Sequence, residues 1–123
     1  MRKQLIPFVV AMLAVLAAAA RVEAHALLIR AEPRVGSTVN KPPREVRVWF
    51  SETVHPAASS IEVLNASGKQ VDKADTHSDR GHGAILCISL LPALMPGTYK
   101  VVWRVTSMDT HVTNGNFHFR IAR

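Results

Sequence analysis

The sequence predicts an all-β domain, an immunoglobulin-like Greek-key β-sandwich, preceded by a cleavable signal peptide. Three observations support this expectation. Short runs rich in β-branched and aromatic residues alternate with turns that contain Gly, Pro, Asn or Ser, at the regular spacing typical of sandwiches. Patterns typical of helices are nearly absent after residue 24. Before that point, a positively charged start precedes an almost unbroken apolar run.

Residues 1–24 have the layout of a secretory signal peptide, with small residues before a cleavage site after Ala24. A retained membrane anchor is the alternative, but a span needs about 20 apolar residues. The apolar run here has 16 residues and contains Pro7. Cleavage after Ala20 also satisfies the small-residue rule. We favour the later cut, which makes His25 the first residue of an exported domain, residues 25–123, with no stable membrane insertion.

Composition limits what this domain does. Residues 25–123 carry a formal charge of +4 that is spread along the sequence. A nucleic-acid-binding protein usually shows a basic stripe with interleaved aromatics, and none is present. The single cysteine, Cys87, cannot form an intramolecular disulfide and is expected to be a buried small hydrophobe. The expected product is an exported protein with one hydrophobic core and no sign of an oligomer, so we expect a monomer.

The expected strands follow from alternation and from apolar runs. Glu45 to Phe50 alternates cleanly, with Trp49 opposite the core face. Residues 72–83 are polar and are expected to form a long surface loop, and Asn114-Gly115 is expected to form a turn. In chain order, the strand-like runs cover residues 26–29, 45–50, 61–64, 70–71, 85–90, 99–105 and 117–121.

Residues 94–99 have the pattern of a tyrosine corner. Pro96-Gly97 forms the turn, and the Tyr99 hydroxyl is placed to donate a hydrogen bond to the backbone upstream. Tyr99 then begins the core face of a long strand that includes Trp103.

The candidate site combines Asp109 and His111 with His25. Residues two apart on an extended strand point to the same side, so the first two side chains converge. An N-terminal histidine chelates through its amine and its imidazole. Together they offer three nitrogens and one oxygen, the tetragonal donor set that Cu(II) prefers. Because these nitrogens must lose protons to bind copper, the copper affinity is expected to decrease when the pH drops below about 6 to 7.

The other histidines carry weaker signals. His77 and His82 lie with two aspartates in the polar loop, in a spacing that matches no closed zinc pattern. A solvated loop is therefore favoured, and a contribution of His55, His77 or His82 to a second metal site stays open. His118 is expected to face solvent.

Matching segments run in order through residues 25–123. They are His25 directly after the leader, Glu32-Pro33, Gly36-Ser37, Phe50-Ser51-Glu52, the segment Pro96 to Trp103, Ser107-x-Asp109-x-His111, Asn114-Gly115 and Phe117-x-Phe119. With these segments the sequence resembles the CopC family of small periplasmic copper-binding proteins. The resemblance implies a cupredoxin-like β-sandwich that binds one Cu(II) through His25, Asp109 and His111.

One departure from the family pattern concerns methionine. Some members carry a Cu(I) site in a methionine-rich loop after the Phe-Ser-Glu segment, whereas residues 53–60 here contain no methionine. Thioether ligands select Cu(I), so no Cu(I) site is expected.

The expected function is copper resistance or homeostasis, by sequestering Cu(II) or delivering it to an inner-membrane transporter of the CopD type, without catalysis. Two alternatives stay open. A copper monooxygenase also uses an N-terminal histidine, although 99 residues leave little room for a broad substrate face. A metal-free immunoglobulin-like interaction module would show no change in thermal stability with Cu(II), whereas native-state binding raises stability.

Overall fold

The computed structural model describes residues 26–123; the predicted leader and His25 lie outside the described residues. The described chain forms eight strands and one short 3-10 helix, Pro56–Ala58. The strands are β1 (Leu28–Glu32), β2 (Thr38–Val39), β3 (Glu45–Phe50), β4 (Ser60–Leu64), β5 (His77–Asp79), β6 (His82–Ser89), β7 (Gly97–Thr106) and β8 (Val112–Ile121). None of the helical segments in residues 26–123 has the length and apolar character that a membrane crossing requires.

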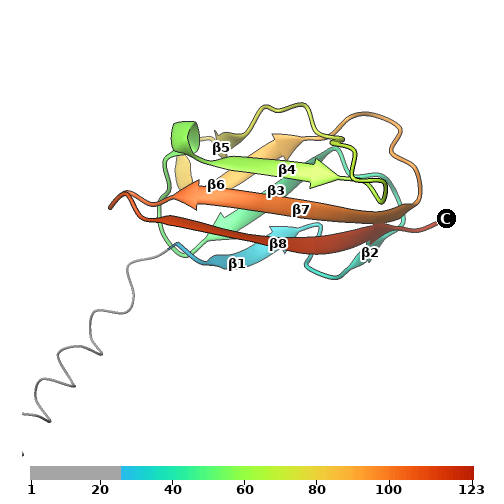
Figure 1. The fold of residues 1–123 in the computed structure, drawn as a ribbon, viewed down its shortest axis with the longest axis horizontal. Helices are drawn as coiled ribbons and strands as arrows, with labels where there is room; N and C mark the ends of the chain where they lie inside the picture. Colours follow the sequence, from blue (N-terminus) through green and yellow to red (C-terminus); the bar gives the residue numbers. More distant parts are fainter. Residues whose placement is uncertain (1–25) are drawn as a thin grey trace, which may run out of the picture.

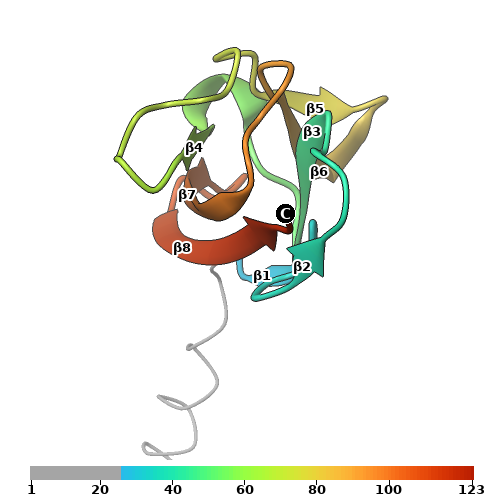
Figure 2. The same ribbon diagram turned by 90° about the vertical axis from the view of Figure 1, so that its right-hand side faces the viewer.

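The strands form two four-stranded sheets that pack face to face. One sheet has the order β1-β3-β6-β5 and the other β2-β8-β7-β4. Figure 2 shows them on opposite sides of the core, with β4, β7 and β8 facing β3 and β6. The longest ladder joins β7 and β8 antiparallel, from the Gly97–Ile121 pair to the Thr106–Val112 pair. The predicted all-β sandwich is therefore confirmed.

The core forms where the inward faces of the two sheets meet. Val46, Val48 and Phe50 are buried as their alternation predicts, and Phe50 packs edge-to-face on Trp103 with 5.3 Å between ring centroids. Burying one such side chain contributes about 1.5–3 kcal/mol. This core holds the sandwich together without a disulfide, since Cys87 is a free cysteine.

The tyrosine corner is confirmed. Tyr99 is buried, its hydroxyl donates to the Met95 carbonyl over 2.5 Å, and its ring stacks on Phe119 at 5.4 Å between centroids. These contacts fix the start of β7 against β8 at the end of the sandwich where the chain ends (Figure 1).

The predicted surface loop over residues 72–83 is wrong in part. Residues His77–Asp79 form β5, which pairs with β6 at the edge of its sheet. Asp72 is buried and accepts hydrogen bonds from the amides of Val63 and Ala74, at 2.8 and 2.9 Å. An edge strand pairs on one side, so it is often short and polar, and its residues lack the apolar alternation on which the prediction depended.

The predicted turn at Asn114-Gly115 is also wrong, because both residues lie inside β8 opposite Arg104 and Trp103. A Cβ atom at Gly115 would lie 2.6 Å from Cζ2 of the Trp103 indole. Glycine is therefore needed here to admit the indole ring, and the chain reverses earlier, at residues 107–111.

Candidate metal centre

The turn between β7 and β8 carries two of the three predicted ligands. The Ser107 amide donates to the His111 carbonyl and the Thr110 amide donates to the Ser107 carbonyl, each over 2.9 Å. Thr110 has a φ of 70°, the left-handed conformation that closes such a turn. Asp109 and His111 thus converge through turn geometry, and the prediction from strand alternation gave the right neighbours for the wrong reason.

The side chains of this turn form one hydrogen-bonded chain. The Ser107 hydroxyl donates to Oδ1 of Asp109, and Oδ2 of Asp109 lies 3.0 Å from Nδ1 of His111. Ser107 is completely buried, whereas the side chains of Asp109 and His111 are 43% and 53% exposed. A buried hydroxyl therefore orients a carboxylate that faces an imidazole at the surface.

The electrostatics of these hydrogen-bonded side chains favour a cation beside them. The Ser107 hydroxyl, and after it the imidazole of His111, hold the pKa of Asp109 below its ordinary value, so this carboxylate is charged at neutral pH. When a neutral imidazole donates Nδ1–H to a carboxylate, its lone pair is on Nε2. Such a carboxylate–imidazole pair is the arrangement in which proteins orient a histidine toward a metal.

The order of these contacts argues against a nucleophilic serine. In a hydrolytic triad the serine hydroxyl donates to the imidazole, which takes up its proton. Here the carboxylate lies between Ser107 and His111, and the hydroxyl is buried. The contacts therefore do not have the order in which an imidazole activates a serine.

Segments distant in sequence meet at the same end of the sandwich. The Thr113 hydroxyl donates to the Ala26 carbonyl over 2.8 Å, and Ala26 is almost fully buried. From the other side, Val54 forms a β-bridge with Ser107, and the His55 amide donates to the Thr106 carbonyl over 2.9 Å. Figure 1 shows the start of β1 beside the turn between β7 and β8.

The predicted ligand set is only partly within the described chain. Asp109 and His111 are brought together, and His25 lies outside the described residues. Across residues 26–123, no group of three or more His, Cys, Asp or Glu side chains is placed to hold a metal ion.

Two of the remaining candidates in residues 72–83 make structural contacts, and His82 is exposed at the start of β6. Nδ1 of His77 lies 2.7 Å from the Asp75 carbonyl, and Asp79 forms an ion pair with Arg47. Cys87 is buried as predicted, and burial raises the pKa of its thiol to about 11, so it offers no thiolate at neutral pH.

Two more histidines lie outside the turn. His118 is exposed on β8, as predicted, whereas His55 is half-buried.

Sequence reasoning assigned no role to Ser107 or Thr113. Ser107 carries a recognisable signal, a small hydroxyl residue two positions before the aspartate at the end of an apolar strand. Thr113 carries none, because its partner is a backbone carbonyl 87 positions earlier in the sequence.

Comparison with known proteins gives consistent matches. The CopC domain matches residues 28–122. Protein YobA from Escherichia coli strain K12 is 29% identical over 98 residues, which cover 80% of this chain and 79% of YobA. Copper resistance protein C from Xanthomonas campestris pv. juglandis is 28% identical over 124 residues, covering 91% of each chain.

Solved structures show the same fold. CopC from Methylosinus trichosporium OB3b aligns with a TM-score of 0.74 and 32% identity, covering 80% of this chain and 94% of that one. PcoC from Escherichia coli, a methionine-rich copper resistance protein, aligns with a TM-score of 0.68 and 27% identity, covering 80% and 99% of the two chains.

Proposed function

Because the chain belongs to the CopC family, we propose that its copper-related function is to hold one Cu(II) ion at the turn between β7 and β8. The ligands in this proposal are the amine and imidazole of His25, a carboxylate oxygen of Asp109 and an imidazole nitrogen of His111. Three nitrogens and one oxygen suit the tetragonal geometry of Cu(II), which also heads the affinity order of divalent first-row metals. Copper is the cargo of this protein and not a cofactor for catalysis.

The observation that carries this proposal is the anchor of the first described residue beside the turn. The Ala26 carbonyl accepts a hydrogen bond from Thr113, which lies two residues after His111. Consecutive Cα atoms are about 3.8 Å apart, so the residue that precedes Ala26 is joined to a point already fixed at this end of the sandwich. In this proposal, the amino end at residue 25 approaches the Asp109–His111 pair from this anchor.

The proposal requires export and cleavage after Ala24. Cleavage at that bond frees the amine of His25, and the amine and the imidazole of one residue then form a chelate. We place the mature protein, residues 25–123, in the periplasm as a monomer.

The methionine positions support Cu(II) over Cu(I). Met95 and Met108 are the methionines of the described chain, and both are exposed, at 74% and 56%. Met95 belongs to the tyrosine corner and Met108 to the opposite turn, so the two thioethers lie at opposite ends of β7. Cu(I) prefers several soft ligands together, and the described chain does not provide them.

We infer a binding role in copper resistance or homeostasis, in which the protein sequesters Cu(II) or passes it to an inner-membrane transporter of the CopD type. The exposure of Asp109 and His111 supports this role, because a surface site can receive and release an ion without opening the core.

Electron paramagnetic resonance of the protein purified from the periplasm tests the proposal. Intact mass first establishes that the chain begins at His25. Titration with Cu(II) is then expected to give one axial copper signal with nitrogen couplings, saturating at one ion per chain. A signal identical to that of copper in buffer, or a chain that begins at another residue, would contradict the proposed site. Ascorbate-dependent peroxide production above that of free copper would favour an oxidase.

A further inference from the structure

The outer face of the sheet β2-β8-β7-β4 gathers positive charge that is scattered in the sequence. Lys100 and Arg104 point outward from β7, and His118 and Arg120 point outward from β8. All four are exposed. We call these four residues the basic face; in Figure 2 this side of the sheet is turned away from β3 and β6.

The charges of the basic face are not neutralised within the described chain. None of Lys100, Arg104 and Arg120 forms an ion pair among residues 26–123. The acidic side chain on the strands of this face is Glu62, on β4 opposite Val102. Three formal positive charges therefore face one negative charge.

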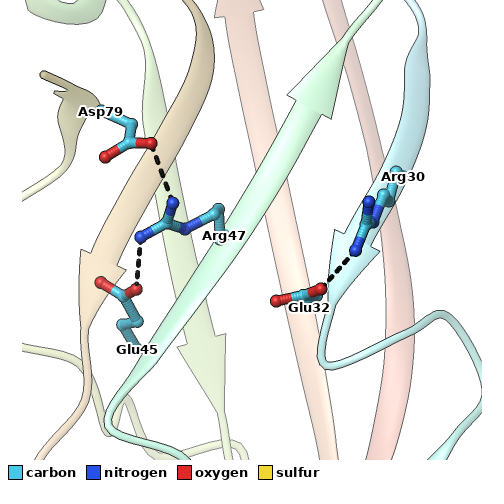
Figure 3. A network of polar contacts seen from close by, with 5 residues as sticks. All are labelled: Arg30, Glu32, Glu45, Arg47 and Asp79. Carbon is cyan, nitrogen blue, oxygen red and sulfur yellow. Dashed lines mark hydrogen bonds and ion pairs between the residues drawn. The ribbon is translucent and has the colours of Figure 1, made fainter. Parts of the chain in front are cut away.

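The outer face of the other sheet shows the contrasting arrangement. Arg30 pairs with Glu32 at 2.5 Å, and Arg47 pairs with both Glu45 and Asp79, at 2.9 and 2.8 Å. Figure 3 shows the two arginines on the neighbouring strands β1 and β3, each beside its carboxylate partners. Arg30 and Arg47 are thus each matched by a carboxylate of the same chain, whereas none of the three formal cations of the basic face is.

The types of side chain on the basic face limit the class of partner that it can bind. From the Thr98–Arg120 pair to the Arg104–Asn114 pair, the outward positions carry no large exposed hydrophobic side chain. Membrane-surface binding usually combines basic residues with apolar side chains that insert into the lipid. Single-stranded nucleic acids usually stack on aromatic side chains, and the outward positions of β7 and β8 carry no Phe, Tyr or Trp. A basic and amide surface instead suits a protein with an acidic patch.

We propose that the basic face docks an acidic surface of a partner protein, next to the β7–β8 turn. Alternate residues on a strand advance about 6.6–6.8 Å, so Lys100 and Arg104 lie about 13 Å apart along β7. The turn begins three residues after Arg104. A partner seated on these residues has its edge at Asp109 and His111. The docking is independent of copper. It rests on the proposed function only in the assumption that the partner exchanges copper with this protein.

Electrostatics gives this docking a measurable signature. Uncompensated charges on one face steer an oppositely charged partner and mainly raise its association rate. The Debye length shortens from about 30 Å at 0.01 M salt to about 8 Å at 0.15 M. Binding through the basic face must therefore weaken strongly over this range of salt.

A decaglutamate peptide labelled with a fluorophore is the probe, with the metal-free protein. The test variant is K100E/R104E, and the matched control is K41E/K73E, which changes the net charge equally at two exposed lysines off the basic face. We expect the test variant to bind the peptide about tenfold more weakly than the control at low salt. Amide chemical shifts of the wild-type protein should move on β7 and β8.

Three outcomes would overturn the proposal. Equal losses in the two variants would show that binding follows net charge, and shifts confined to other strands would place the contact elsewhere. Tighter binding to vesicles containing phosphatidylglycerol than to the peptide, with the same dependence on Lys100 and Arg104, would indicate a membrane. Thermal unfolding controls for misfolding, and the milder K100Q/R104Q variant repeats the test. Copper titration of the same proteins is a separate readout, so failure of the metal site leaves the peptide result interpretable.

Discussion

The two ends of the β7–β8 ladder use polar side chains in opposite ways. At one end Tyr99 is buried, and its hydroxyl donates to a backbone carbonyl of its own corner. At the other end the buried hydroxyl of Ser107 supports a carboxylate and an imidazole that are about half exposed. At the Tyr99 end the chain enters β7 from β6 of the other sheet, and at the Ser107 end it reverses from β7 into β8.

The difference separates stability from function. A buried hydrogen bond contributes about 0.5–1.5 kcal/mol to folding, whereas exposed ion pairs contribute little. Asp109 and His111 are therefore expected to matter little for folding and much for binding, and Tyr99 the reverse. Substitutions at the two ends test this separation.

Removing the imidazole of the turn should have the largest effect. His111→Ala is expected to lower Cu(II) affinity by about 100-fold, equivalent to about 2.7 kcal/mol, with little change in the free energy of unfolding. Competition titration measures the affinity and urea unfolding the stability. His118→Ala, at an exposed histidine on β8, is the matched control and should bind copper like the wild type. Equal losses in both variants would remove His111 from the ligand set.

Replacing the carboxylate should have the next largest effect. Asp109→Asn keeps the shape of the side chain but removes its charge, and Cu(II) affinity is expected to fall by about 10- to 100-fold. The same titration measures the loss. An unchanged affinity would mean that Asp109 neither binds the metal nor orients His111.

Ser107→Ala should have a smaller effect that depends on pH. The Ser107 hydroxyl holds the pKa of Asp109 below its ordinary value, so its loss lets the carboxylate take up a proton at a higher pH. Copper affinity is expected to fall by about tenfold at pH 7, and the gap from the wild type should widen as the pH falls toward 4. A gap that stays constant from pH 7 to 4 would show that the hydroxyl acts through position alone.

A substitution in the tyrosine corner, at the other end of the ladder, should change stability and leave copper affinity unchanged. Tyr99→Phe removes the hydroxyl that donates to Met95 while keeping the stacked ring, and it should lower the free energy of unfolding by about 1 kcal/mol. Its copper affinity should equal that of the wild type. A loss of affinity in this variant would show that the two ends are coupled through the ladder.

Much of the fold follows from the sequence because its signals are local. The alternation from Glu45 to Phe50 and the turn before Tyr99 each predict their structure within six residues. The predictions failed where the structure at a residue is determined by a partner distant in sequence. Gly115 makes room for Trp103 across the ladder, and β5 is polar because it lies at a sheet edge.

The same distinction holds at the candidate site. Asp109 and His111 are close in sequence, and their proximity was predictable. The support from Ser107 and the anchor of Ala26 by Thr113 depend on the tertiary arrangement. The basic face could not be predicted for the same reason, since Lys100 and Arg120 come together only when β7 pairs with β8.

The most direct test compares two proteins that differ by one glycine placed before His25. Both keep every described residue, and both should unfold at the same temperature without metal. The protein that begins at His25 is expected to bind one Cu(II) about 100-fold more tightly, because the extra residue separates the amine from its imidazole. Equal affinity for the two proteins would contradict the claim that the freed amino end of residue 25 completes the copper site.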